Sequence, residues 1–73
     1  MEKEIKIQTP FIKLDALLKF ADVVSSGGEA KRLIQNGLVF YNGEVCAIRG
    51  KKCVPGDKIV VQGITVLVRE AGA

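Results

Sequence analysis

Basic and amide side chains gather in one short stretch of the chain. Lys31, Arg32 and Gln35 lie within residues 25–37, at spacings that put them on one side of a helix, away from a buried stripe. Their ammonium, guanidinium and amide groups donate hydrogen bonds, and the two charged groups attract anions. The stretch therefore suits contact with a polyanion. The plain alternative is the solvated face of an amphipathic helix.

Both ends of this helix are marked in the sequence. Ser26 followed three residues later by Glu29 forms a capping box, in which the hydroxyl accepts a hydrogen bond from an unpaired amide and the carboxylate reaches back to the cap. Gly37 can adopt the left-handed conformation that ends a helix. The buried stripe predicted between these ends consists of Ala30, Leu33 and Ile34.

Two glycines, Gly27 and Gly28, stand at the start of this helix. Without side chains they allow a close approach to the backbone, where free amides and the helix dipole attract an anion such as phosphate. The alternative is a flexible entry to the helix that binds nothing, because the capping box already satisfies some of those amides.

The positive charge of the chain is concentrated in its second half. There are 11 Lys and Arg residues against 8 Asp and Glu, which gives a net charge of +3. Arg49, Lys51 and Lys52 form a second basic cluster, in a polar loop near a predicted hairpin. This cluster either joins the basic helix in one binding surface or only solubilises the loop, and the sequence leaves the choice open.

The residues needed for catalysis or metal binding are missing. The chain has no histidine, and its two cysteines, Cys46 and Cys53, lack the close pairing of a zinc knuckle or a redox motif. Asp15 has no second carboxylate or nucleophile arranged with it. We therefore expect no enzymatic activity and no cofactor, and we interpret both cysteines as small buried hydrophobes.

The remaining pattern predicts one small domain of 73 residues with an α+β fold. Two short helices in a helix-turn-helix arrangement pack on a small twisted antiparallel sheet, with a β-hairpin around the turn Asn42-Gly43. The predicted helices cover 14–22 and 25–37, and the predicted strands cover 2–8, 38–41, 44–46, 58–62 and 64–69.

The aromatic residues are assigned by position. Phe11 and Phe20 are expected in the core. Phe40 and Tyr41 alternate along a strand, so one points inward and the other is available for stacking, and the sequence does not say which. No apolar run is long enough for a signal peptide or for a span across a bilayer, so we expect a cytoplasmic protein with reduced thiols.

With these elements placed, the chain resembles the αL RNA-binding domain family, named after the fourth protein of the small ribosomal subunit. The resemblance covers about residues 11–61, and the short length and the two adjacent glycines are most similar to the stand-alone bacterial branch. It is carried by Lys13-Leu14-Asp15, Leu18, Ser26, Ala30, Leu33-Ile34, Gly37, Val39, Asn42-Gly43 and Pro55-Gly56-Asp57.

The resemblance implies a non-enzymatic protein that binds structured RNA, ribosomal or transfer RNA, through the two-helix surface and the adjacent hairpin loop. It implies no membrane partner, and we expect a monomer that acts in ribosome assembly or translation. Two positions depart from the family: Gly27 replaces a common basic residue, and Lys13 replaces a common arginine. The contacts implied position by position are Lys13, Ser26, Lys31, Arg32, Gln35 and Asn42. The competing hypothesis is a protein-interaction module that uses the sheet or the hairpin.

Overall fold

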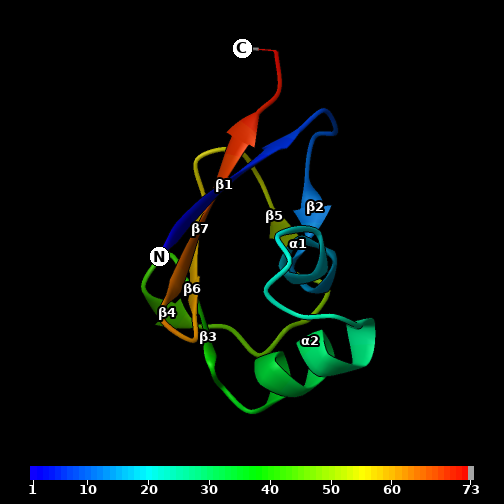
Figure 1. Ribbon diagram of the computed structural model, residues 1–73, viewed down its shortest axis with the longest axis vertical. Coiled ribbons are helices and arrows are strands. Elements are labelled where there is room, and N and C mark those ends of the chain that lie inside the picture. The colour runs from blue at the N-terminus through cyan, green and yellow to red at the C-terminus, as the bar shows by residue number, and fades with distance from the viewer. Residues whose placement is uncertain (73) are drawn as a thin grey trace.

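The computed structural model describes residues 1–72, and Figure 1 labels the elements along the chain. Its helices and strands confirm the predicted α+β class. In chain order the elements are β1 (Glu2–Ile7), β2 (Ile12–Lys13), α1 (Leu14–Phe20), α2 (Gly27–Gln35), β3 (Val39–Tyr41), β4 (Glu44–Val45), β5 (Lys52–Cys53), β6 (Lys58–Val61) and β7 (Ile64–Glu70).

Five strands form the main sheet in the order β1-β7-β6-β3-β4. All neighbours are antiparallel except β1 and β7, which run parallel from Glu2 opposite Thr65 to Ile7 opposite Glu70. The prediction of a purely antiparallel sheet is therefore wrong. Alternation along residues 2–8 shows which face of the strand is buried, but it does not show whether the neighbouring strand runs parallel or antiparallel. The helices follow β1 in the chain, and a connection of this length permits parallel pairing with β7.

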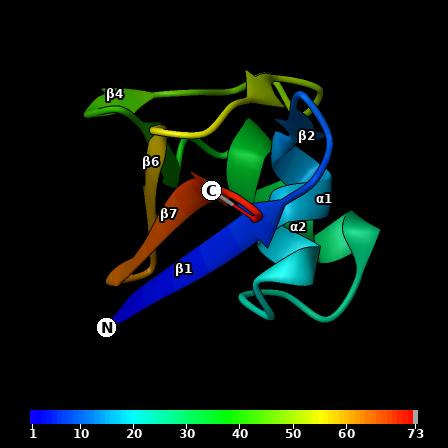
Figure 2. The same ribbon diagram turned by 90° about the horizontal axis from the view of Figure 1, so that it is seen from above.

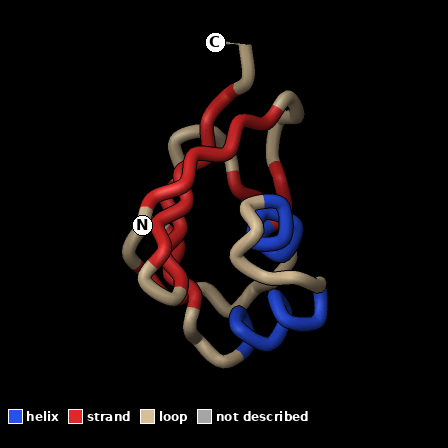
Figure 3. Tube along the Cα trace, in the orientation of Figure 1, coloured by secondary structure: helices blue, strands red, loops and turns tan. Residues whose placement is uncertain are grey.

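Both helices lie on one side of the five-stranded sheet, as Figures 1 and 3 show and the view from above in Figure 2 confirms. The core between these layers holds the predicted stripes of both helices, for example Leu17 of α1 and Ile34 of α2. The Nζ of Lys3 on β1 donates a 2.8 Å hydrogen bond to the carbonyl oxygen of Ala21 at the end of α1. That bond ties the edge strand to the helical layer, where a cation also suits the helix dipole.

Phe20 corrects the expectation of a core position, because 63% of its surface is exposed. The buried stripe of α1 runs through Leu14, Leu17, Leu18 and Ala21. Phe20 falls to the side of this stripe at helical spacing, so its ring leaves the core.

A second, two-stranded sheet was not predicted. β2 and β5 pair antiparallel, with Ile12 opposite Cys53 and Lys13 opposite Lys52. Strands of two residues are too short to show a period of two, and one of them lies in what the sequence indicates as a polar loop. This small sheet brings the basic loop to the start of α1.

The two helices end in the same way, although only one end contains a glycine. After α1, Asp22 has φ of 60° and the amide of Val23 donates to the carbonyl of Leu18 at 3.0 Å. This closure stops α1 at Phe20, so the predicted helix over 14–22 is two residues too long. Asp tolerates the left-handed conformation well enough to replace the usual glycine.

The predicted end signals of α2 are present, although the helix, Gly27–Gln35, is two residues shorter at each end than the predicted range 25–37. The Oγ of Ser26 accepts from the amide of Glu29 at 3.3 Å, and Gly37 has φ of 72°. The amide of Leu38 then donates to the carbonyl of Leu33 at 3.1 Å, which completes the closing motif. No helix within residues 1–72 is long and apolar enough to cross a membrane.

The predicted β-hairpin is also confirmed. Asn42 and Gly43 have φ of 51° and 90°, both in the left-handed region that a two-residue turn of this hand requires. The hairpin pairs Tyr41 with Glu44 and Phe40 with Val45. Since Phe40 is exposed and Tyr41 is half-buried against the core, the choice that the sequence left open is settled.

Candidate nucleic-acid interface

Four basic residues meet where β2, β5 and the segment between β4 and β5 adjoin the start of α1. We call Lys13, Arg49, Lys51 and Lys52 the basic junction. Lys13 and Lys52 are directly opposite in the β2–β5 pair, and both are exposed. Side chains at opposite positions of an antiparallel pair share one face and lie close together, so the two ammonium groups repel each other.

No residue of the basic junction forms an ion pair within residues 1–72, although the carboxylate of Asp57 lies near enough to Lys51 for the lysine charge to lower its pKa. Within residues 1–72 the ion pair formed is Arg69 with Glu4, at 3.8 Å, and it involves no residue of the basic junction. Lys13 is also the N-cap residue of α1, yet its side chain makes no capping hydrogen bond. A cation at a helix start is unfavourable and serine, threonine, asparagine or aspartate is preferred there, so folding alone does not explain this lysine.

The segment that carries the other three cations is anchored by its backbone. The amide of Leu14 donates to the carbonyl of Lys51 at 2.9 Å, and the amide of Asp15 donates to the carbonyl of Arg49 at 3.1 Å. The basic loop therefore has a defined place beside Lys13. Whether this loop binds RNA or only solubilises the chain stays a matter for experiment, but its position next to Lys13 is fixed.

Two lysines of the basic junction lie over aromatic rings. The Nζ of Lys52 is 4.9 Å from the centroid of Phe11, and the Nζ of Lys51 is 5.0 Å from the centroid of Tyr41. Such cation–π contacts contribute about 0.5–1 kcal/mol at exposed sites and restrict the lysine side chains. Phe11 is half-buried, so it supports the basic junction from beneath and is not a core residue as expected.

Asp57 joins the hairpin tip to the turn before β6. Its carboxylate accepts hydrogen bonds from the hydroxyl of Tyr41 at 2.5 Å, from the Nδ2 of Asn42 at 3.1 Å and from the amide of Val54 at 2.9 Å. The Oδ1 of Asn42 accepts from the amide of Lys58 at 2.8 Å. We call Asp57, Tyr41 and Asn42 the polar hub. Asn42, which the family resemblance implies as an RNA contact, thus also has a structural role.

Charge and hydrogen bonding shift two pKa values in the polar hub. Burial alone would raise the pKa of Asp57, but hydrogen bonds from Tyr41, Val54 and Asn42, together with the charge of Lys51, hold it below its usual value. The hydrogen bond to Asp57, burial and the charge of that carboxylate raise the pKa of Tyr41 to about 12. The pair is therefore a carboxylate and a neutral phenol at neutral pH.

The exposed side of α2 carries a second set of predicted contacts. We call Lys31, Arg32 and Gln35 the α2 face; all three are exposed, and none of their side chains forms a hydrogen bond or an ion pair within residues 1–72.

At the helix start, a Cβ built on Gly27 would meet no atom within 4 Å, and one on Gly28 would only reach the Oγ of Ser26 at 4.0 Å. Packing does not demand these glycines, and the surface there is open.

The predicted site residues thus form two groups, with α1 between them. α1 contacts β2 and β5 as well as α2, and in Figure 1 it lies between these elements. The basic junction stands at its start, and the α2 face belongs to the neighbouring helix. Both turns of the polar hub, Asn-Gly and Pro-Gly-Asp, can be recognised in the sequence. Their contact cannot, because Asn42 and Asp57 are 15 residues apart in the chain.

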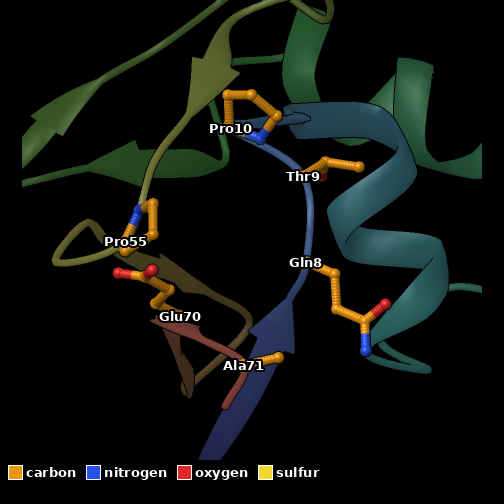
Figure 4. Close-up of a pocket in the computed structure, with 6 residues that line it drawn as sticks. All are labelled: Gln8, Thr9, Pro10, Pro55, Glu70 and Ala71. Atoms are coloured by element: carbon orange, nitrogen blue, oxygen red, sulfur yellow. The ribbon is translucent and has the colours of Figure 1, made fainter. Parts of the chain in front are cut away.

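A hollow of about 450 Å³ lies away from these cations, at the ends of β1 and β7 (Figure 4). Gln8, Thr9 and Pro10 lie on one side of it, and Pro55, Glu70 and Ala71 lie on the other. None of its lining residues is basic, and the carboxylate of Glu70 would repel phosphate. This hollow is therefore not suited to a nucleic-acid backbone.

The two cysteines differ in burial. Cys53 is fully buried, as expected, and burial raises its pKa to about 12. Cys46 is half-buried at the edge of the core. Within residues 1–72, no three His, Cys, Asp or Glu side chains are gathered in a way that could hold a metal ion.

A comparison with known families identifies the family of this chain. The chain belongs to the S4 domain family, whose model matches residues 5–69. The family resemblance inferred from the motifs is thereby confirmed. The chain is also similar to a protein of Bacillus subtilis (strain 168) named as the probable ribosome maturation protein RlbA, with 40% identity over 63 residues that cover 86% of this chain and 89% of the relative.

Proposed function

We propose that this chain is a non-enzymatic RNA-binding protein that docks on structured RNA, above all ribosomal RNA, in ribosome assembly or translation. The observation that carries the proposal is Lys13, which occupies the N-cap of α1 without capping it and faces Lys52 across the strand pair. Both features disfavour folding, and a polyanion would relieve the repulsion. Membership of the S4 domain family and the similarity to a probable ribosome maturation protein support the same function.

The mechanism follows from the chemistry of the two basic groups. Lysine and arginine neutralise phosphates and release condensed counterions, so the affinity falls steeply with salt. Charge alone gives no selectivity. A-form RNA hides its base edges in a deep groove, so a rigid surface with cations at fixed separations would select the backbone shape of a folded RNA.

We assign the basic junction and the α2 face to one RNA-binding surface, with α1 and α2 as the helix-turn-helix of the αL motif. Ser26, Gly27 and Gly28 would border it, because the first amides of α2 have no intrahelical partner and the surface above them is open. Asn42 would hold the hairpin tip beside this surface. The protein would act as a monomer in the cytoplasm, where ribosomes are made.

The test is a titration against ribosomal RNA fragments at several salt concentrations. We expect the logarithm of the association constant to fall linearly with the logarithm of the salt concentration, and the double variant Lys13→Ala/Lys52→Ala to flatten this slope by about two units. The double variant Lys6→Ala/Lys19→Ala removes the same charge from exposed positions outside the surface and is the control. Affinity that ignores salt, or an equal loss in the control, would contradict the proposal.

A second candidate function rests on the outer side of the hairpin. Phe40 and Val45 face each other across β3 and β4 and are 41% and 56% exposed, and Leu38 on the same side of β3 is 48% exposed. An apolar patch of this kind suits contact with a protein. If it binds a protein of the ribosomal particle, Phe40→Ser will abolish co-sedimentation with ribosomal particles and leave the affinity for RNA fragments unchanged.

A further inference from the structure

A cleft of about 190 Å³ lies between the hairpin and the segment that runs from β4 to β5. Tyr41 and Glu44 line it from the hairpin, and Cys46, Ile48 and Lys51 line it from the segment. Its position is determined by hydrogen bonds at both ends: the amide of Cys46 donates to the carbonyl of Val39 at 2.9 Å, and the carbonyl of Lys51 accepts from the amide of Leu14 at 2.9 Å. The cleft is thus a built feature of the fold.

The walls of the cleft combine an aromatic ring with exposed apolar side chains. Ile48 is 64% exposed and Val45 is 56% exposed, and both line the cleft, so its apolar side is a patch of two large side chains. The ring of Tyr41 is held in place by its hydrogen bond to Asp57, and the Nζ of Lys51 lies over one face of the ring, 5.0 Å from its centroid. Sites for drug-sized ligands measure roughly 300–1,000 Å³. At about 190 Å³ this cleft is smaller than such sites, which matches an occupant the size of a single flat group.

The charges at the rim distinguish between two kinds of occupant. Lys51 brings a donor, and Glu44, opposite Tyr41 in the β3–β4 pair, brings a carboxylate on the same face. A carboxylate repels phosphate but accepts hydrogen bonds from the ring N–H or amino group of a base. The cleft therefore suits a neutral heterocycle with donor and acceptor atoms on its edge, and it excludes the backbone that the basic junction attracts.

We propose that this cleft holds one unpaired base of the RNA whose phosphates lie on the basic junction. Lys51 belongs to both sites, so a nucleotide next to a bound phosphate is within reach of the cleft. Proteins that recognise RNA in detail do so at bulges and loops, where an unstacked base can lie against an aromatic side chain. The inference rests on the proposed function and deepens it, because it adds recognition of a single-stranded position to recognition of backbone shape.

The experiment compares two synthetic RNA hairpins, one fully paired and one with a single-nucleotide bulge, the bulge being made with each of the four bases in turn. Base–aromatic stacking contributes about 1–3 kcal/mol per base. We expect at least one bulged RNA to bind about tenfold more tightly than the paired RNA. Equal affinity for the paired RNA and all four bulged RNAs would overturn the inference.

Variants show whether the cleft is responsible. Ile48→Ser should bring the ratio of bulged to paired affinity close to one and leave the affinity for paired RNA unchanged. Val54→Ser is the matched control, since Val54 is 42% exposed and does not line the cleft, and it should change neither affinity. Melting temperatures of both variants should match that of the parent. A loss in Ile48→Ser that is equal for paired and bulged RNA would count against the cleft.

A chemical readout needs no substitution. Cys46 lines the cleft, so a bound base should slow its alkylation by N-ethylmaleimide, whereas paired RNA at equal saturation should not. Equal protection by both RNAs contradicts the inference. Failure of the proposed function looks different: the chain would then bind neither RNA in a salt-dependent way, and Lys13→Ala/Lys52→Ala would have no effect on either.

Discussion

The cations of the basic junction and of the α2 face form no ion pair within residues 1–72, but only the junction is held by contacts between elements. Lys13 and Lys52 lie on paired strands, and the carbonyls of Arg49 and Lys51 accept hydrogen bonds from the start of α1. On the α2 face, Lys31 and Arg32 are fixed only by the helix beneath them. Two kinds of basic surface therefore stand side by side, one preorganised and the other adaptable.

This difference predicts that the two groups contribute to RNA binding in different ways. Ordering a long side chain on binding costs about 0.5–1.5 kcal/mol, and a cation that is already restricted avoids part of this cost. The cation–π contacts of Lys51 and Lys52 provide such restriction. The basic junction should fix where an RNA lies, and the α2 face should add affinity with less demand on position.

The largest effect is expected from the polar hub that supports one side of the junction. Asp57→Ala removes three hydrogen bonds to a buried carboxylate and leaves the hydroxyl of Tyr41 and the amide of Val54 without their partner. We expect the free energy of unfolding to fall by about 3 kcal/mol or more, which is about 15 °C in melting temperature for a domain of this size. Thermal denaturation measures it. Glu2→Ala is the control and should stay close to the parent.

Acid should have a related effect. Because the pKa of Asp57 is held below its usual value near 3.8, its contribution to stability is complete above that value and is lost as the pH falls through the lower pKa of the folded state. Unfolding at pH 2–4 should therefore remove less stability from Asp57→Asn than from the parent. An identical acid dependence in both would show that the hub does not depend on the charge.

The next largest effect separates the two basic groups directly. Lys13→Ala/Lys52→Ala and Lys31→Ala/Arg32→Ala remove the same charge, so each should flatten the salt slope of RNA binding by about two units. The junction variant should lose more affinity, about 2 kcal/mol against about 1, because it removes preorganised contacts. Equal losses would mean that preorganisation does not matter. If Lys31→Ala/Arg32→Ala changed neither the affinity nor the salt slope, the α2 face would not belong to the RNA-binding surface.

The sequence predicted the parts of this surface better than their arrangement. The cap formed by the hydroxyl of Ser26, the hairpin at Asn42-Gly43 and the stripes of both helices depend on neighbours within four residues, and all are present; of the predicted capping box, only the hydrogen bond from the Glu29 amide to Ser26 is observed. The parallel pairing of β1 and the pairing of Lys13 with Lys52 across β2 and β5 join residues far apart in the chain. Local patterns do not encode such contacts, so they were missed.

Two errors have local causes. α1 ends two residues early because Asp22 adopts a left-handed conformation that is usually read from a glycine. Phe20 was expected in the core because its ring is large and apolar. Its position on α1 lies beside the buried stripe, and the ring is therefore exposed. The candidate residues themselves came from the family resemblance and from charge. Their division into a fixed and an adaptable group required the strand register.

A smaller effect should show that the junction is costly to folding. Lys13→Ser removes the repulsion from Lys52 and gives α1 a side chain able to cap it, so the free energy of unfolding should rise by about 1 kcal/mol. RNA affinity should fall at the same time. Urea unfolding and RNA titration of one preparation measure both, with Lys19→Ser as the control that gains no stability. A variant that is both less stable and unchanged in RNA binding would contradict this view of Lys13.

The smallest effect concerns the two thiols, which report on the two sides of the junction without a change in net charge. Cys53 lies on β5 directly after Lys52; it is fully buried, and burial raises its pKa to about 12, so at pH 8 it should react with iodoacetamide only when the β2–β5 pair opens. Cys46 is half-buried and should react first. Mass spectrometry over time should show one modification, followed by a second whose rate increases with urea. If the junction is as firmly held as its contacts indicate, RNA will slow the second modification less than it slows the first, because the strand pair is already closed in the free protein. Simultaneous modification of both thiols would instead place the junction with the adaptable surface of α2.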